Sequence, residues 1–128
     1  MAPLTQENET VIRRLFQEVS VKMLPSAETA DFKKYTVLEK SCCLEDFGDF
    51  FAGLRCAFRD CRLNIKSIAA KGDKVMVHYT VCGMQKGDFL GVSATGEKMV
   101  VIGIDVFRLN EGKVVQHWDA AHQLSVAR

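Results

Sequence analysis

Two carboxylates and one imidazole near the C-terminus are the side chains of this sequence best suited to proton-transfer chemistry. Asp105 stands inside an apolar stretch, and His117 and Asp119 follow a turn at Asn110-Glu111-Gly112. In an antiparallel hairpin around that turn, Asp105 would lie opposite or diagonal to His117 and Asp119, at roughly 5 to 8 Å. Strand alternation gives this face its apolar members, which are Val101, Gly103, Phe107 and Val115.

A carboxylate in such surroundings can serve both as an acid and as a base. Loss of water raises its pKa, because burial disfavours the charged form, and two carboxylates in one apolar pocket cannot both ionise freely. A carboxyl group whose pKa approaches neutrality can take a proton and give it back. We therefore expect Asp119 to be the general acid/base, Asp105 to orient or hydrogen-bond the substrate oxygen, and His117 to tune both.

Each of these residues also has a purely structural interpretation. Asp119 could cap the C-terminal segment, a turn role that Asp often fills. Asp105 could pair with His117 or with Arg108, although alternation directs Arg108 to the other face. An unpaired buried carboxylate would be costly, so Asp105 needs some partner. His117 could equally be a satisfied core histidine.

No metal or organic cofactor is expected. The five cysteines form no Cys-x-x-Cys pair, and the spacing of His117, Asp119 and His122 fits no standard zinc site. No glycine-rich phosphate loop connects a strand to a helix. The number of cysteines is odd, and Met1–Thr10 lacks the apolar centre of a secretory signal, so we expect reduced thiols rather than disulfides.

Length and composition indicate one globular domain over residues 1–128. Apolar residues make up 48% of the chain and charged residues 26%, and the formal net charge is +1. Chains of this size and composition usually close around a single core. Lys and Arg are scattered along the sequence, which argues against a nucleic-acid partner. The apolar stretches are too short to cross a bilayer, so we expect no membrane association and a soluble, cytoplasmic protein.

Helical patterns fill the first half of the chain and strand patterns the second. This order predicts an α+β fold with helices on one face of an antiparallel sheet. Apolar residues at every fourth position predict a helix over Glu7–Met23, with Thr5 as its N-cap and Pro25 as its end. A short helix is expected over Ala27–Tyr35 and a third helix over Leu44–Phe58.

Period-two patterns predict four strands, over Arg62–Ile68, Val75–Cys82, Lys98–Leu109 and Lys113–Asp119. Tight turns at Lys71-Gly72-Asp73 and Asn110-Glu111-Gly112 join the strands in pairs, because glycine readily adopts a positive φ. Alternation in the second strand places Tyr79 on one face and His78 on the other.

Two stretches of the second half carry a resemblance to a known family. They are Gly87–Gly96 and Gly103–Asp119, and Leu54–Phe58 followed by Asp60 is similar to the end of that family's helix. Together they resemble the SnoaL-like polyketide cyclases of the nuclear transport factor 2-like superfamily. The resemblance implies a conical barrel, in which N-terminal helices close a curved antiparallel sheet over a pocket for a small apolar molecule. It also implies intramolecular aldol closure without cofactor or metal, and a homodimer formed through the outer face of the sheet.

The sequence departs from that family at two histidines. A His expected before the third helix has no counterpart in Tyr35–Cys43, and a second His is replaced by Gln85. The string Ile104-Asp105-Val106 is also similar to the ketosteroid isomerase segment that carries a hydrogen-bond-donating Asp. Phe16 occupies the helix region where that enzyme has its assisting Tyr, so the isomerase mechanism does not transfer intact.

Two functions are therefore expected. The first is a cofactor-free acid/base enzyme that cyclises or isomerises a small, largely apolar carbonyl compound, and the pair of Asp105 and Asp119 favours it. The second is non-catalytic binding of a small apolar molecule, which the missing histidine favours. A third interpretation, a dimeric protein-interaction module, would require a filled pocket. A homodimer is expected in any case, because Ile102, Ile104 and Val106 would otherwise form an apolar patch on the outer face of the sheet.

Overall fold

Two helices and four strands follow each other in the order that the sequence predicts. The computed structural model describes residues 2–22 and 45–126. Its elements are α1 (Ala2–Lys22), α2 (Glu45–Ala57), β1 (Phe58–Lys71), β2 (Lys74–Gln85), β3 (Lys98–Asn110) and β4 (Lys113–Val126). The expected helix over Ala27–Tyr35, the helix end at Pro25 and the loop Tyr35–Cys43 lie outside the described residues.

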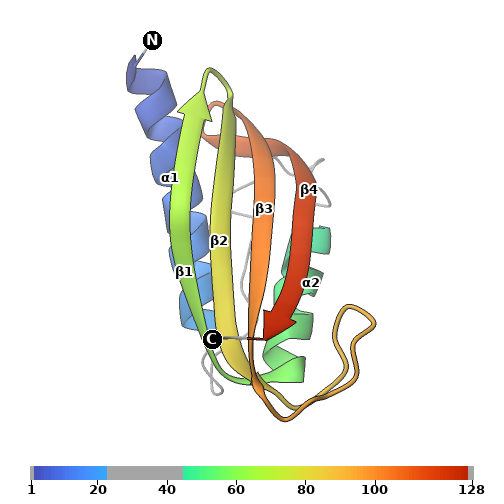
Figure 1. Cartoon of the computed structure of the whole chain (residues 1–128). Coiled ribbons are helices and arrows are strands. Elements are labelled where there is room, and N and C mark those ends of the chain that lie inside the picture. Colours follow the sequence, from blue (N-terminus) through green and yellow to red (C-terminus); the bar gives the residue numbers. More distant parts are fainter. Residues whose placement is uncertain (1, 23–44, 127–128) are drawn as a thin grey trace.

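The four strands form one antiparallel sheet in the order β1-β2-β3-β4, and both helices cover the same face of it (Figure 1). This arrangement confirms the predicted α+β class. The sheet is curved, and register shifts interrupt β1 and β4, where extra residues bend and twist a strand. Within the described residues β1 and β4 remain the two edges, so the sheet does not close into the expected barrel.

Helix α1 buries one apolar face against the sheet. Its fully or nearly fully buried residues are Ile12, Leu15, Phe16 and Val19. The helix begins at Ala2, upstream of Thr5, so the prediction that Thr5 is the N-cap is wrong. Pro3 falls in the first turn of α1, where a proline is tolerated because the backbone N–H that it lacks would have no partner within the helix.

Helix α2 leads directly into the first strand. Phe47, Phe51 and Leu54 are buried at helical spacing, as the sequence predicts. The strand starts at Phe58, four residues before its expected beginning at Arg62, and Asp60 takes a positive φ of 58° within a register shift. Asp is one of the few side chains that adopt this conformation readily, which explains how the chain bends from helix to strand here.

The two predicted hairpin turns are confirmed. Lys71 pairs with Lys74 across Gly72, whose φ is 60°, and Asn110 pairs with Lys113. Both central residues of the second turn have positive φ, Glu111 at 52° and Gly112 at 75°, which matches the twist of the flanking strands.

The last strand departs most from the prediction. It runs to Val126 instead of ending near Asp119, and it contains two register shifts. The first leaves Val115 without a partner, so Val114 is the fully buried valine and Val115 is only half-buried. The second leaves Ala120 without a partner, so Asp119 pairs with Asp105, and His122 pairs with Gly103. His122 thereby lies on the same face of the sheet as Asp105.

Candidate functional site

Asp105 is the centre of a polar cluster on the helix-covered face of the sheet. It lies in β3 between Gly103 and Phe107, and only 1% of its side chain is exposed. The Nε2 atoms of His117 and His122 lie 3.6 Å and 3.5 Å from the same carboxylate oxygen, Oδ1. Both imidazoles approach from slightly beyond ordinary hydrogen-bond distance. One carboxylate is therefore held between two groups that can each carry a positive charge.

The protonation of Asp105 differs from the sequence-based expectation. Burial is the largest single influence and by itself would raise the pKa of this carboxyl. Weak hydrogen bonding from His117 and His122, together with their charge, outweighs burial and lowers the pKa below its ordinary value. The direction is opposite to the one that burial alone predicts, because both imidazoles, His117 and His122, oppose burial. The lowered pKa favours the charged form of Asp105, which faces both imidazole nitrogens and has no proton to donate.

Tyr79 reaches the cluster from the neighbouring strand. Its side chain is fully buried, and its hydroxyl oxygen lies 3.2 Å from Nε2 of His122. Tyr79 is the register partner of Gly103, and Gly103 is the register partner of His122. The tyrosine side chain therefore crosses the whole of β3, over a position without a side chain, to reach β4.

Aromatic rings flank both imidazoles. The His117 ring stacks on Phe107, with centroids 4.8 Å apart, and meets the edge of Phe47 at 5.3 Å. The His122 ring stacks on Phe50, with centroids 3.9 Å apart and an interplanar angle of 13°. Such rings exclude water and strengthen the electrostatic interactions between the polar groups that they surround.

The hairpin places the three predicted site residues on neighbouring positions of two strands. In the register, Asp119 lies directly opposite Asp105, and His117 lies opposite Phe107, diagonal to Asp105. The side chain of Asp119 lies outside the described part of the structure. Contact within the described residues is therefore shown for Asp105 and His117, whereas a role for Asp119 stays a prediction.

Sequence reasoning missed Tyr79 and His122 as members of this cluster. Strict alternation from Asp119 directs His122 to the outer face, and the unpaired Ala120 reverses this. Tyr79 was expected on the face of β2 opposite His78, but nothing in its local sequence shows how far its hydroxyl extends. A glycine opposite a tyrosine in two predicted strands was the available signal, because it leaves room for the ring to cross.

Gln85, which stands where the resembling family has its second histidine, has a structural role. The side chain is fully buried. Its amide nitrogen donates to the carbonyl oxygens of Gly87 and Val92, each at 3.0 Å, and its amide oxygen accepts from the Thr95 hydroxyl at 3.4 Å. Gln85 therefore holds together the loop between β2 and β3, and its polar atoms are engaged there.

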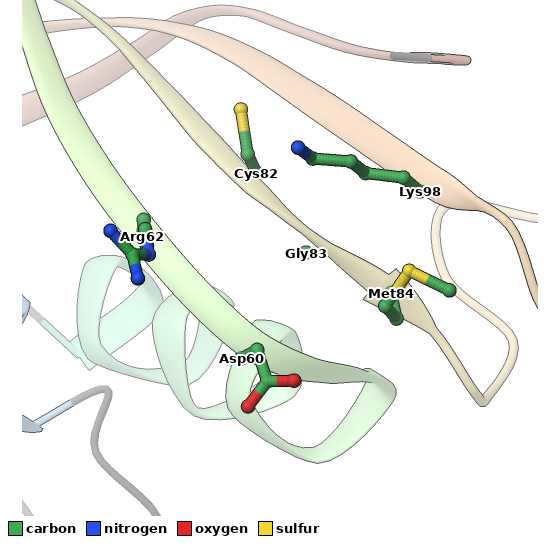
Figure 2. Close-up of a pocket in the computed structure, with 6 residues that line it drawn as sticks. All are labelled: Asp60, Arg62, Cys82, Gly83, Met84 and Lys98. Atoms are coloured by element: carbon green, nitrogen blue, oxygen red, sulfur yellow. The ribbon is translucent and has the colours of Figure 1, made fainter.

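The opposite face of the sheet carries a hollow of about 330 Å³ near the C-terminal end of β2. Figure 2 shows its lining residues, which come from β1, β2 and β3 and are Asp60, Arg62, Cys82, Gly83, Met84 and Lys98. Both cationic side chains are exposed, and this hollow lies on the other side of the sheet from Asp105. It belongs to the outer surface and not to the Asp105 cluster.

Metal ligands and reactive thiols are not evident in the described parts of the chain. Over residues 2–22 and 45–126, no group of three or more His, Cys, Asp or Glu side chains is arranged to hold a metal ion. Cys56, Cys61 and Cys82 are free thiols, whereas Cys42 and Cys43 lie outside the described residues. Burial, aided by the charge of Asp60, raises the pKa of Cys61 to about 11, which makes this thiol a poor nucleophile.

No helix in the described segments has both the length and the apolar character needed to span a membrane.

Comparison with known proteins gives a consistent family match. The model of the SnoaL-like polyketide cyclase family matches residues 9–128. The chain is similar to AclR, a hydroxylase candidate from Streptomyces galilaeus, with 26% identity, 90% of this chain and 76% of that chain covered, and a TM-score of 0.65. It is also similar in fold to a candidate SnoaL-like polyketide cyclase from Jannaschia sp. CCS1, with 21% identity, 95% and 88% coverage, and a TM-score of 0.70. No functionally curated protein matches the chain at a significant level.

Proposed function

This chain belongs to the SnoaL-like polyketide cyclase family, and we propose that it is a cofactor-free acid/base enzyme acting on a small, largely apolar carbonyl compound. The reaction would be an aldol cyclisation or an isomerisation. The observation that carries the proposal is the buried Asp105 carboxylate, whose Oδ1 lies within 3.6 Å of two imidazole nitrogens. Buried titratable groups that perturb one another are typical of sites that transfer protons.

A purely structural role explains this cluster less well. Burying a carboxylate is unfavourable unless partners compensate, and a well-packed apolar side chain at the same place is often as stable or more stable. Position 105 has Val101 and Phe107 as apolar neighbours on its own face of the strand. A charge in that place is therefore better explained by chemistry than by stability.

The proposed roles divide the chemistry between two carboxylates. Asp119 is the general acid/base, since its backbone lies directly opposite Asp105 at the centre of the hairpin. Asp105 acts as a buried anion whose Oδ1 faces the Nε2 atoms of both imidazoles. His117, whose side chain is 3% exposed, tunes the charge of Asp105 from within the core.

The substrate class follows from the aromatic surroundings. Phe47, Phe50 and Phe107 contact the two imidazoles, so a molecule beside them must be largely apolar, with a polar group that can meet an imidazole or a carboxyl. A carbonyl compound satisfies both conditions. Its oxygen can accept a hydrogen bond, and the carbon next to the carbonyl can lose a proton to a base.

Deuterium exchange tests the proposal without knowledge of the natural substrate. Small aromatic ketones such as 2-tetralone should exchange the hydrogens next to the carbonyl with D2O faster in the presence of the protein. General acid/base assistance predicts an acceleration of roughly 10²- to 10⁴-fold for a well-placed ketone. NMR spectroscopy measures the loss of the proton signal over time. An exchange rate equal to that of buffer containing an unrelated protein would contradict the enzymatic proposal.

Binding without turnover is the second candidate, and the engagement of Gln85 favours it. The resembling family has a histidine at this place, whereas the Gln85 amide is occupied by Gly87, Val92 and Thr95. If that histidine is essential elsewhere in the family, this chain would bind a small apolar molecule without catalysing the reaction. Saturable binding of 2-tetralone without any deuterium exchange would support this candidate. The likeness to AclR makes oxygen insertion a further outcome to examine in the products.

We also propose that the protein forms a homodimer through the outer face of the sheet. Met76, Val106 and Trp118 are register partners on adjacent strands and form one apolar row, in which Met76 is 46% and Trp118 is 41% exposed. Exposed apolar patches usually mark an interface. Light scattering should give twice the monomer mass at micromolar concentration, and Trp118→Glu should shift it to the monomer. A monomer mass for the unaltered protein across this range would contradict the proposal.

A cytoplasmic location is part of the proposal. The free thiols of Cys56, Cys61 and Cys82 support it, because reduced cysteines persist in reducing compartments.

A further inference from the structure

Because Gly103 has no side chain, the Tyr79 ring can lie across β3 and reach from β2 to β4. A Cβ atom built at this position would overlap Cζ and the hydroxyl oxygen of Tyr79, and would lie 2.8 Å from Cε1 of the same ring. Real Cβ atoms do not come this close to another atom. Any larger residue at position 103 would therefore displace the Tyr79 ring from β3. The backbone of Gly103 has no positive φ, so space and not backbone conformation explains the glycine.

Contacts at the edge and on the face of the imidazole fix the orientation of His122. The Tyr79 hydroxyl lies 3.2 Å from Nε2, and Asp105 Oδ1 lies 3.5 Å from the same nitrogen. The face of the imidazole is held by the parallel ring of Phe50 at 3.9 Å. A hydrogen-bonding contact at the edge and a stacked ring on the face together restrict rotation of the imidazole about its side-chain bonds.

We propose that Tyr79 is a positioning residue of the site, and that the His122 that it holds is the group that contacts the oxygen of the ligand. This inference rests on the proposed function and deepens it by assigning the oxygen-contacting group. The exposed fractions of the side chains favour His122, because they are 14% for His122, 3% for His117 and 1% for Asp105. Asp105 was the residue expected to contact the substrate oxygen, but its carboxylate is buried. It instead lies next to His122 and supplies a negative charge beside the imidazole.

The assignment balances the protons of an aldol closure. Asp119 takes a proton from the carbon next to one carbonyl group, and that carbon forms a bond to the carbon of a second carbonyl. The oxygen of the second carbonyl gains the proton that protonated His122 donates. The proton on Asp119 then returns to His122 through solvent or product, so the site ends in its starting state. The Asp105 carboxylate, with Oδ1 3.5 Å from Nε2 of His122, is the counter-charge beside the imidazole during this step.

The first test examines the free protein and needs no substrate. In protein labelled with 15N-histidine, Tyr79→Phe should move the ring nitrogen signals of His122, because the hydroxyl at 3.2 Å is lost while the ring is retained. The signals of His78, on the outer face, serve as an internal control and should not move. His122 signals that coincide in Tyr79→Phe and wild type would overturn the positioning role.

Two glycine variants distinguish displacement of the Tyr79 ring from a general effect of the substitution on folding. Gly103→Ala should disturb the His122 signals as Tyr79→Phe does, because Tyr79 must leave β3. Gly53→Ala in α2 is the matched control, since its added Cβ would lie an ordinary 3.8 Å from Phe89. Gly53→Ala should leave the His122 signals unchanged and raise the melting temperature slightly, because alanine favours helix more than glycine does. A Gly103→Ala protein with unchanged His122 signals would contradict the inference.

The second test adds a ligand and distinguishes this inference from the proposed function. Titration with 2-tetralone should move the His122 signals more than those of His117 and His78, and Tyr79→Phe should lower the exchange rate roughly 3- to 10-fold. Normal exchange with unmoved His122 signals would overturn the inference and leave the proposed function intact. Moved His122 signals without exchange would support the oxygen-contacting role and overturn the proposed chemistry.

Discussion

Asp119→Asn is expected to lower the rate of deuterium exchange by roughly 10²- to 10⁴-fold, the usual contribution of a general acid/base. The amide has nearly the shape of the carboxyl group but neither takes nor releases a proton. The backbone of Asp119 pairs with Asp105 at the centre of the hairpin, so the substitution leaves the register of the two strands unchanged. Exchange kinetics with 2-tetralone across a range of pH values measure the effect.

Asp60→Asn is the matched control for this prediction. Asp60 is exposed, lies on the other side of the sheet and has a positive φ of 58°, which Asn adopts as readily as Asp. Asp60→Asn should therefore retain the exchange rate and the melting temperature of wild type. If Asp119→Asn keeps full activity with an unchanged pH profile, the catalytic assignment is wrong and binding without turnover takes its place.

The parts of the fold that follow from regular periodicity could be predicted from the sequence. Phe47, Phe51 and Leu54 repeat at helical spacing and are buried in α2. Val75 and Val77 alternate with exposed residues and are buried in β2. The turn at Glu111 and Gly112 fixed the pairing of Asn110 with Lys113 and of Leu109 with Val114. A regular hairpin continued from this turn would place Trp118 opposite Asp105, and the unpaired Val115 brings Asp119 there instead.

Irregularities explain what could not be predicted. A β-bulge adds one residue and reverses the face of everything beyond it. The unpaired Ala120 therefore brings His122 to the face of Asp105, where alternation alone excludes it. The contact between Tyr79 and His122 spans three strands and depends on a glycine in the middle one, so it is a property of the assembled sheet and not of any local pattern.

The protonation of Asp105 shows how one missed residue changes a chemical conclusion. From the sequence, burial and a second carboxylate were expected to raise the pKa of a carboxyl group in this place, and His117 was expected to tune it. The structure adds His122 to His117, and together they lower it. The chemistry assigned to Asp105 accordingly changes from donating a hydrogen bond to a substrate to holding the imidazoles that surround it.

Asp105→Asn should therefore destabilise the protein at neutral pH by about 1 to 3 kcal/mol, the usual consequence of removing one member of a buried polar contact. The pKa of Asp105 is lower in the folded chain than its ordinary value of 3.8, so the folded state favours the charged form. The stabilisation is present above the unfolded pKa and is lost as the pH falls through the folded pKa. The difference between variant and wild type should thus be largest near neutrality and shrink below about pH 4.

Denaturant unfolding of both proteins at several pH values measures this difference, with Asp73→Asn as the control. Asp73 also has a lowered pKa, chiefly through its hydrogen bond with Arg108, but both side chains are about half exposed. Water screens such surface pairs, so Asp73→Asn should change the stability much less than Asp105→Asn. If Asp105→Asn is instead more stable than wild type at neutral pH, the free energy needed to bury the carboxylate exceeds the stabilisation that the two imidazoles provide. The proposal that the imidazoles compensate for the burial of the Asp105 carboxylate would then be contradicted.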